Sequence, residues 1–393
     1  MYPPPEIGSR ALFPSLKHQV YANHASVSPL SLQAIAAIAE VCTTQATEAV
    51  DAMIGFHENV AGTRAVAARL MGVPAAHIAV LANTSLAISS VAASIDWKAG
   101  DTIVLFRGEF PANTTPWQQA ANQHGLQLLW IDAHDFDDGL GMQQLEAVLQ
   151  SNRVRMVAVS AVQFNTGLRM PVEDMATLAH QHGAEIFVDA IQAFGATPFD
   201  ANDLDYVASG GQKWLMGPPG AALLYAKDWA KLQPTLAGWL SHEDGLVFLW
   251  GDPDLLRYDR PIIQGPALFE GGTLNFAGIA GLTAAMHITE TIGIANIYAH
   301  ANQWNDALES ILDTLGFQSL RSPHPARRSC MLCAKPPSGH HAGRIASALA
   351  GDGISVASPD GHIRFSPSWP NSLEEISTVQ AALEKAVSSP SAI

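Results

Sequence analysis

Lys213 and Asp189 are the residues of this chain best suited to do chemistry together. Lys213 lies in a glycine-containing segment, residues 208–217, and Asp189 ends the apolar run 186–188. Partial burial would lower the pKa of the lysine and leave a neutral amine able to condense with an aldehyde. The aspartate could hold the proton of a pyridine nitrogen. Each residue taken alone could also be an ordinary surface group.

A lysine that forms a Schiff base and an acid that pairs with a ring nitrogen are the two groups that pyridoxal phosphate (PLP) chemistry requires. The pair therefore predicts a PLP-dependent enzyme that acts on a small amino acid. Lys213 would hold the cofactor and then move the Cα proton of the substrate, while Asp189 would favour a quinonoid intermediate.

Two turns have the composition of a phosphate site. Thr84 and Ser85 follow the apolar run 78–81 and precede a helical pattern. Hydroxyls and free backbone N–H groups at the start of a helix bind phosphate well. Gly272 and Thr273 form a second small, hydroxyl-bearing turn. Plain N-capping and an ordinary loop are the alternatives at these two positions.

Side chains that could surround the cofactor ring follow three of the predicted strands. Phe110 could stack on a planar ring, although a lone aromatic residue at a strand end is more often part of the core. Asn165 and Gln192 offer amides to a ring hydroxyl, and Ile191 could pack against the ring. These residues predict a ring site beside Lys213.

Arg364 lies inside a short apolar strand, residues 363–366. A guanidinium in such a place needs an anion, and a substrate carboxylate would be a natural bidentate partner. A structural salt bridge is the alternative. Arg364 is therefore predicted to bind the substrate carboxylate.

The helices and strands that must position these residues are predicted to form an α/β domain. Helical patterns at 86–95, 117–124, 142–149 and 175–182 separate several of the apolar runs. Such alternation predicts a mostly parallel sheet with helices on both faces, and ligands then bind at the carboxyl ends of the strands. Seven apolar runs predict the strands: 78–81, 102–106, 126–131, 156–160, 185–189, 206–209 and 221–225.

The pattern changes after about residue 280. Helical stretches at 280–293 and 297–315 lead to short strands near 329–334 and 362–366 and to a helix from Ser372. We expect a large PLP-binding α/β domain over 21–284, and a smaller α+β domain formed by 1–20 and 285–393. An alanine-rich helical pattern also covers 30–50.

Composition narrows the functional class further. The 393 residues are 15% charged with a formal net charge of -15, so a nucleic-acid partner is not expected. The low charge fraction suggests surface buried in an oligomer. Cys42, Cys330 and Cys333 give no disulfide framework, and no second pair completes a metal site with Cys330-x-x-Cys333. Without a signal peptide or membrane span, a cytoplasmic protein is expected.

The segments 188–195 and 209–218 resemble the signature of class V, fold-type I PLP-dependent enzymes. This group includes cysteine desulfurases, selenocysteine lyases, kynureninase, isopenicillin N epimerase-like proteins and several aminotransferases. The likeness extends from 21–25 to 363–366 and 374–376. It therefore covers nearly the whole chain.

The resemblance implies a role for each matching residue. Lys213 would form the Schiff base, Asp189 would pair with the ring nitrogen, and Gln192 would lie near the ring hydroxyl. Thr84 and Ser85 would bind phosphate. The family's dimer brings a Gly-Thr turn to the partner's phosphate, so Gly272 and Thr273 imply a homodimer with shared active sites. The resemblance also implies that Arg364, Asn23 and His24 bind the substrate. Ser209 and Gln212 would contact the cofactor.

Departures from the family pattern bear on the reaction. Phe110 occupies the position of a stacking histidine in desulfurases and cannot move protons. Segment 351–361 contains no cysteine, and Cys330 and Cys333 lie in a strand-like run, which disfavours a cysteine desulfurase. Gly210 replaces a hydroxyl residue, so Ser209 could supply that phosphate contact. Gln192 replaces the histidine of kynureninase.

We therefore predict an aminotransferase-type enzyme. β-Elimination by a C–S lyase and amino-acid epimerisation are the alternatives. A further hypothesis, from a different functional class, is a protein with the PLP fold that binds the cofactor or a partner without catalysing a reaction.

Overall fold

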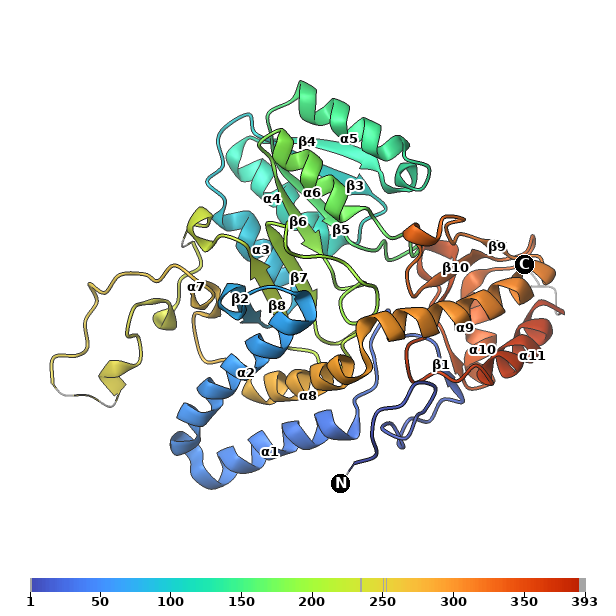
Figure 1. Cartoon of the computed structure of the whole chain (residues 1–393), viewed down its shortest axis with the longest axis horizontal. Helices are drawn as coiled ribbons and strands as arrows, with labels where there is room; N and C mark the ends of the chain where they lie inside the picture. Colours follow the sequence, from blue (N-terminus) through green and yellow to red (C-terminus); the bar gives the residue numbers. More distant parts are fainter. Residues whose placement is uncertain (1, 234, 250, 252, 389–393) are drawn as a thin grey trace.

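The protein has an α/β fold built on a seven-stranded sheet, seen here in a computed structural model that describes residues 2–233, 235–249, 251 and 253–388 (Figure 1). The strand order is β2-β8-β7-β6-β5-β3-β4. β8 runs antiparallel to both neighbours, and the other pairs are parallel. The predicted mostly parallel sheet is confirmed. Its strands are β2 (Ile78–Leu81), β3 (Thr102–Arg107), β4 (Gln127–Asp132), β5 (Val154–Ser160), β6 (Glu185–Asp189), β7 (Tyr206–Gly210) and β8 (Ala222–Ala226).

Helices cover both faces of this sheet, which explains why its central strands read as nearly unbroken apolar runs. Alternate residues of one strand enter different cores: Val104 and Phe106 face one side, and Ile103 and Leu105 face the other. α3 (Thr84–Ser94) and α4 (Thr115–His124) pack on the second side. α5 (Leu140–Ser151) and α6 (Val172–Gln181) pack on the first.

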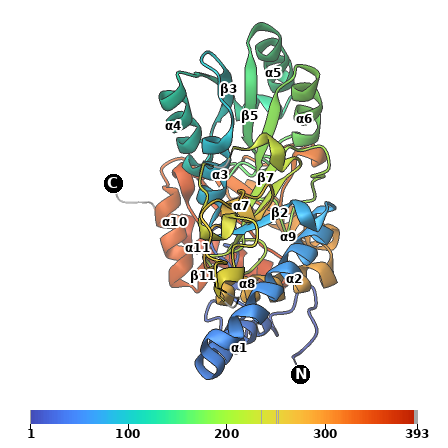
Figure 2. The same cartoon turned by 90° about the vertical axis from the view of Figure 1, so that its left-hand side faces the viewer.

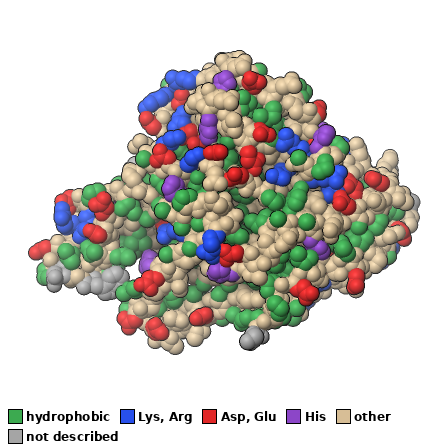
Figure 3. Space-filling view, viewed as in Figure 1, with side chains coloured by type: hydrophobic (Ala, Val, Ile, Leu, Met, Phe, Trp, Pro, Cys, Tyr) green, Lys and Arg blue, Asp and Glu red, His purple; other side chains and the backbone are tan. Residues whose placement is uncertain are grey.

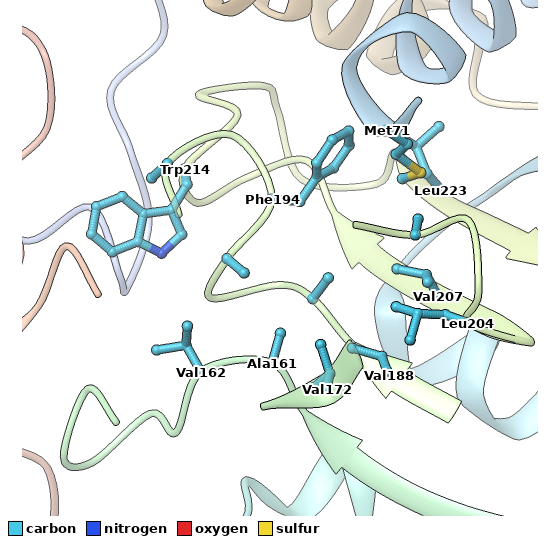
Figure 4. Packing of buried hydrophobic residues seen from close by; sticks show 14 of the residues in the cluster. Met71, Ala161, Val162, Val172, Val188, Phe194, Leu204, Val207, Trp214 and Leu223 are labelled. Carbon is cyan, nitrogen blue, oxygen red and sulfur yellow. The ribbon is translucent and has the colours of Figure 1, made fainter. Parts of the chain in front are cut away.

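The first core also holds the segment that carries the predicted site. Val188, Val207 and Leu223 come from three neighbouring strands and pack with Phe194, as Figure 4 shows. Trp214 lies in the same core, directly after Lys213. Burial of these side chains fixes the backbone on both sides of the lysine, because close-packed interiors leave little room for displacement.

Three long helices lie below the sheet in Figure 1. α1 (Leu32–Glu48) begins at Ser31, whose side chain accepts a hydrogen bond from the Ala34 N–H. α1 and α2 (Met53–Met71) both pack against α8 (Phe276–Ile292). The sequence did not predict α2, which contains Gly55 and Gly62, because glycine weakens a helical pattern.

The C-terminal part of the chain forms a second, smaller core. β9 (Gln318–Ser319), β10 (Leu332–Lys335) and β12 (Ile363–Phe365) form an antiparallel sheet in the order β12-β10-β9. The N-terminal strand β1 (Val20–Tyr21) pairs with β11 (Ile354–Ser355), which ties the start of the chain to this part. The helices that pack there are α9 (Ile294–Thr314), α10 (Ala342–Gly351) and α11 (Glu375–Ser388).

An arm extends from the sheet between η5 (Trp229–Lys231) and α7 (Ala267–Glu270), and it is drawn in yellow in Figures 1 and 2. The arm exposes large apolar side chains to solvent. Such side chains, when they gather in one place, usually mark an interaction surface. They include Leu236, Trp239, Phe248, Leu249, Leu256 and Tyr258.

Charged side chains of both signs are interspersed over the face drawn in Figure 3. Within the described residues, no helix has the length and apolar character needed to cross a membrane. Nor do three His, Cys, Asp or Glu side chains gather there in a group that could hold a metal ion.

Candidate active site

Lys213 and Asp189 meet at the carboxyl ends of two neighbouring strands. Asp189 is the last residue of β6 and is buried, and Lys213 follows β7 by three residues. Burial lowers the pKa of Lys213 to about 8, with Arg364 also lowering it and Asp189 opposing them. Burial raises the pKa of Asp189 to about 6, against the Ile191 N–H and Lys213. The lysine is therefore closer to its neutral, nucleophilic form than a surface lysine is.

The turn that carries Lys213 is packed too tightly for larger residues. A Cβ atom on Gly210 would lie 2.5 Å from Gln212 Oε1 and 2.9 Å from Thr84 Oγ1. Met216, three residues after the lysine, adopts a positive φ of 56°. The absence of a side chain at Gly210 thus lets the lysine turn approach the start of α3.

Thr84 is the first residue of α3, so the helix begins two residues earlier than the sequence predicted. Its Oγ1 atom is buried and has no hydrogen-bond partner among the described residues. Asn83 caps the helix by accepting a hydrogen bond from the Leu86 N–H, at 2.8 Å. Ser85 lies in the same first turn, and Ser209 donates its hydroxyl to the Gly210 carbonyl at 3.3 Å. An unpaired hydroxyl at the positive end of a helix fits a phosphate group.

Phe110 lies beside the lysine, as a ring-stacking residue should. Lys213 Nζ is 5.7 Å from the centroid of the Phe110 ring. The Phe110 ring meets the Phe164 ring edge-on at 5.3 Å, and Phe110 is 48% exposed. Asn165 follows Phe164 directly. One face of Phe110 is thus available to a planar cofactor.

Arg364 is buried without an anionic partner in the described part of the chain. Nη1 donates to the Phe164 carbonyl at 2.8 Å and Nη2 to Ser26 Oγ at 2.9 Å, while Nε has no partner. The salt bridge considered as the alternative is not seen. Asn23 accepts a hydrogen bond from Ser26 Oγ at 2.7 Å, so it orients the hydroxyl that contacts Arg364. Ser26 was not predicted from the sequence.

Gln192 and His24 are both held by contacts within the protein. Gln192 Nε2 donates to the Ala25 carbonyl at 3.1 Å, and its Oε1 accepts from Trp214 Nε1 at 2.9 Å. His24 Nδ1 lies 2.7 Å from Ser28 Oγ, and burial lowers the pKa of its imidazole to about 3. His24 is thus a neutral residue that packs near Trp214, and one Gln192 N–H is left for a ligand.

Glu109 is a second carboxylate near Asp189 that was not predicted from the sequence. It accepts hydrogen bonds from the Ser160 N–H at 2.6 Å, from the Ser160 hydroxyl and from Gln163 Nε2 at 2.9 Å. Burial, with a smaller contribution from the negative charge of Asp189, raises the pKa of Glu109 to about 7 against the lowering effect of these hydrogen bonds. Its position one residue before Phe110 was the only signal in the sequence.

Gly272 and Thr273 do not join this group of residues. The turn lies after α7, where Gly271 accepts a hydrogen bond from Leu240 N–H and Gly272 approaches Trp239 of the arm. Their assignment to the phosphate of a partner subunit stays a prediction.

Cys330 and Cys333 are both buried, and burial raises the pKa of each thiol to about 12. Cys330 lies 3.4 Å from the Ala196 carbonyl, and Cys333 is part of β10. A thiol with a raised pKa carries little thiolate and is a poor nucleophile. Cys42, on α1, is exposed.

The fold, with a lysine, a buried aspartate and an unpaired hydroxyl at the start of a helix near the carboxyl ends of its strands, is that of a fold-type I PLP-dependent enzyme. The chain belongs to the class-V aminotransferase family, whose model matches residues 20–383. The residues fit the cofactor, because the unpaired Thr84 hydroxyl, the open face of Phe110 and buried Asp189 meet around Lys213.

The comparisons with individual proteins point to cysteine desulfurases. A cysteine desulfurase of Escherichia coli O8 (strain IAI1) is 32% identical over 264 residues, covering 66% of this chain and 61% of the relative. The match thus spans about three-fifths of the relative's length. A cysteine desulfurase from Thermococcus onnurineus NA1, solved in its apo form, is 25% identical with a TM-score of 0.82 and 94% coverage of both chains.

The cystine C–S lyase C-DES, solved with cysteine persulfide, shares the fold with a TM-score of 0.84 at 23% identity over 94% of this chain and 98% of its own. The matches to the two cysteine desulfurases favour the C–S lyase alternative over the aminotransferase prediction.

Proposed function

We propose that the protein is a PLP-dependent C–S β-lyase that acts on cysteine or a cysteine derivative and releases its sulfur as a free thiol or sulfide. The observation that carries the proposal is the Lys213 site, in which a lysine of lowered pKa faces both Asp189 and an arginine without an anion. The likeness to cysteine desulfurases supports chemistry at a C–S bond.

Each site residue has a defined task in this reaction. Arg364 would bind the substrate carboxylate with the guanidinium edge that includes unpaired Nε. Lys213 would hold the cofactor, and Nζ would then accept the Cα proton of the substrate. Asp189 would hold a proton on the ring nitrogen, and Phe110 would cover one face of the ring. When bound, PLP supplies an electron sink for the pair left at Cα.

The electrons balance in an elimination. The Cα–H pair becomes the new Cα–Cβ double bond while the Cβ–S bond breaks, and the sulfur leaves with its own pair as a thiolate. The proton from Cα stays on Lys213 until the sulfur or solvent takes it. The enamine product hydrolyses to pyruvate and ammonia.

The cysteines argue against a persulfide on the enzyme itself. Cys330 and Cys333 are buried with raised pKa values, and Cys42 lies on α1 rather than among the site residues. The sulfur would therefore leave the site in the product.

The proposal is tested by incubating the PLP-loaded protein with L-cysteine and S-alkylcysteines while measuring pyruvate and sulfide or thiol. Lys213→Ala should abolish pyruvate formation, and Cys330→Ser with Cys333→Ser should leave it within about twofold, because buried thiols do not react. Borohydride reduction followed by peptide mass spectrometry should find the cofactor on Lys213. Keto-acid formation from amino acids that have no β-leaving group would instead support the aminotransferase reading.

We also propose that the protein works as a homodimer. The exposed apolar side chains of the arm, and the position of Gly272 and Thr273 at its base, support an interface in which this turn serves the partner's site. Light scattering during gel filtration tests this arrangement. A monomer of 41.7 kDa that is fully active would contradict it.

A further inference from the structure

A cavity of about 450 Å³ lies beside the candidate active site, between the sheet and the C-terminal part of the chain. One wall comes from the ends of β3 and β4 and from the loop that holds Gln163 and Asn165. The other wall comes from β9, Arg321 and Lys335 at the end of β10. None of the residues assigned above to holding the cofactor, other than Asn165, lines it.

The cavity adjoins the active site because two loops line both spaces. Gly108 faces the cavity and Phe110, two residues later, lies beside Lys213. Asn165 lines the cavity, and the adjacent Phe164 carbonyl accepts a hydrogen bond from Arg364. A substrate held by Arg364 would therefore lie near this space.

Two buried polar atoms on the cavity wall have no partner within the described residues. Gln163 is 1% exposed; its Nε2 donates to Glu109, but its Oε1 accepts nothing. Arg321 has a side chain that is 2% exposed, and its Nε donates to nothing. Unpaired buried groups of this kind are costly, so they indicate a ligand that brings one donor and one acceptor.

The charges on the wall have both signs. Arg107 lies over the Trp130 ring at 5.9 Å, and no carboxylate pairs with it or with Lys335 in the described chain. Asp132 and Asp137 supply two negative charges on the side of the cavity that carries Arg107, and Lys335 lies on the opposite side. Arg321 is already compensated, because Nη1 bonds to Asp306 at 2.5 Å and to Glu309 at 2.8 Å.

We propose that this cavity binds the distal amino-carboxylate group of a substrate in which sulfur joins two amino acids. The inference rests on the proposed C–S lyase function and specifies its substrate class. The distal carboxylate would face Arg107 and Lys335, and the distal ammonium would donate to Gln163 Oε1 and face Asp132 and Asp137. The ammonium supplies the donor that Gln163 Oε1 lacks, and the zero net charge of the zwitterion matches the two free cations and two carboxylates.

Four thioethers of cysteine test the proposal with the PLP-loaded protein. L-Cystathionine carries both distal charges, S-(3-carboxypropyl)cysteine only the carboxylate, S-(3-aminopropyl)cysteine only the ammonium, and S-propylcysteine neither. We expect kcat/KM to be highest for L-cystathionine and lowest for S-propylcysteine. Lys335→Gln should raise KM for L-cystathionine about five- to tenfold, as loss of one charge-assisted contact predicts, and leave S-propylcysteine within about twofold.

Lys17→Gln removes an exposed lysine near the N-terminus, far along the chain from the cavity residues, and serves as the matched control. Equal kcat/KM values for the four thioethers would overturn the proposal, because the cavity would then not bind the distal group of the substrate. An equal effect of Lys335→Gln on L-cystathionine and S-propylcysteine would also overturn it.

Failure of the lyase proposal is distinguished by a binding measurement. Lys213→Ala lacks the proton acceptor, so calorimetry with L-cystathionine reports binding without turnover. Binding that Lys335→Gln weakens in this background supports the cavity even if no thioether is cleaved. Binding that Lys335→Gln leaves unchanged contradicts the cavity assignment whatever the activity.

Discussion

Replacing Glu109 by glutamine should change how the stability of the protein depends on pH. Glu109 is enclosed by the Ser160 N–H and hydroxyl and by Gln163, with Asp189 nearby. Burial and the charge of Asp189 together raise the pKa of this carboxyl from 4.5 to about 7 in the folded protein. Folding therefore favours the protonated form.

The size of the effect follows from this difference in pKa. Each pKa unit corresponds to about 1.4 kcal/mol, so the shift from 4.5 to about 7 amounts to roughly 3 to 4 kcal/mol, and to about 2 to 3 kcal/mol once the partial exposure of Glu109 is allowed for. Below pH 4.5 Glu109 is protonated in both states, and this stability is present in full. It is lost as the pH rises through about 7, because the folded protein must then ionise a buried acid.

Glu109→Gln removes this titration. We expect the free energy of unfolding of the variant, relative to the unsubstituted protein, to rise by about 2 to 3 kcal/mol between pH 4.5 and pH 8. Urea unfolding of both proteins without added cofactor, at several values of pH, measures the difference, and groups that titrate alike in both proteins cancel. Glu40→Gln, at an exposed position on α1, is the control. A difference that does not vary with pH would refute the reasoning.

Two further perturbations test the packing around the site. Gly210→Ala should destabilise the protein by about 1 to 3 kcal/mol and weaken PLP binding, because the new methyl group would overlap the Thr84 hydroxyl. Thermal unfolding and cofactor titration measure this; Gly62→Ala, in open space on α2, should stabilise by about 0.5 to 1 kcal/mol. A thiol reagent should label Cys42 in the native protein, and Cys330 and Cys333 only after unfolding; rapid labelling of all three would contradict their burial.

The sequence predicted the main sheet and its helices well because their signals are local. All seven apolar runs are strands of the sheet, and the ends of the helices differ by only a few residues. β10 begins at Leu332, whereas the apolar run began at 329, since residues 329–331 are buried without pairing in the sheet. Apolar character reports burial, and hydrogen bonding to a neighbouring strand is a separate property.

The secondary structure of the C-terminal part was predicted less completely from the sequence. α10 (Ala342–Gly351) was not predicted, and β11 has only two residues, whose partner is β1 at the other end of the chain. Pairing between segments more than 300 residues apart leaves no periodic signal in either segment.

The sequence by itself determined the chemical groups of the site. Lys213, Asp189, Thr84 and Phe110 were identified from residue type and from their place at or after the end of an apolar run, because parallel strands deliver such residues to one edge of a sheet. Arg364 was identified from its charge inside an apolar strand. Their family signature also identified the cofactor.

Only the tertiary structure decided how these groups are poised. Burial lowers the pKa of Lys213 and raises the pKa of Asp189, so the two values approach one another. The fold also places Glu109 close enough to Asp189 for the charge of one carboxylate to affect the other. The tertiary structure also buries Arg364 without an anionic partner among the described residues, and it buries Cys330 and Cys333. The residue types predicted a lysine of lowered pKa, an arginine that needs an anion and cysteines within a strand. The size of each effect depends on residues distant in sequence that meet in space, and for that physical reason no local pattern could supply it.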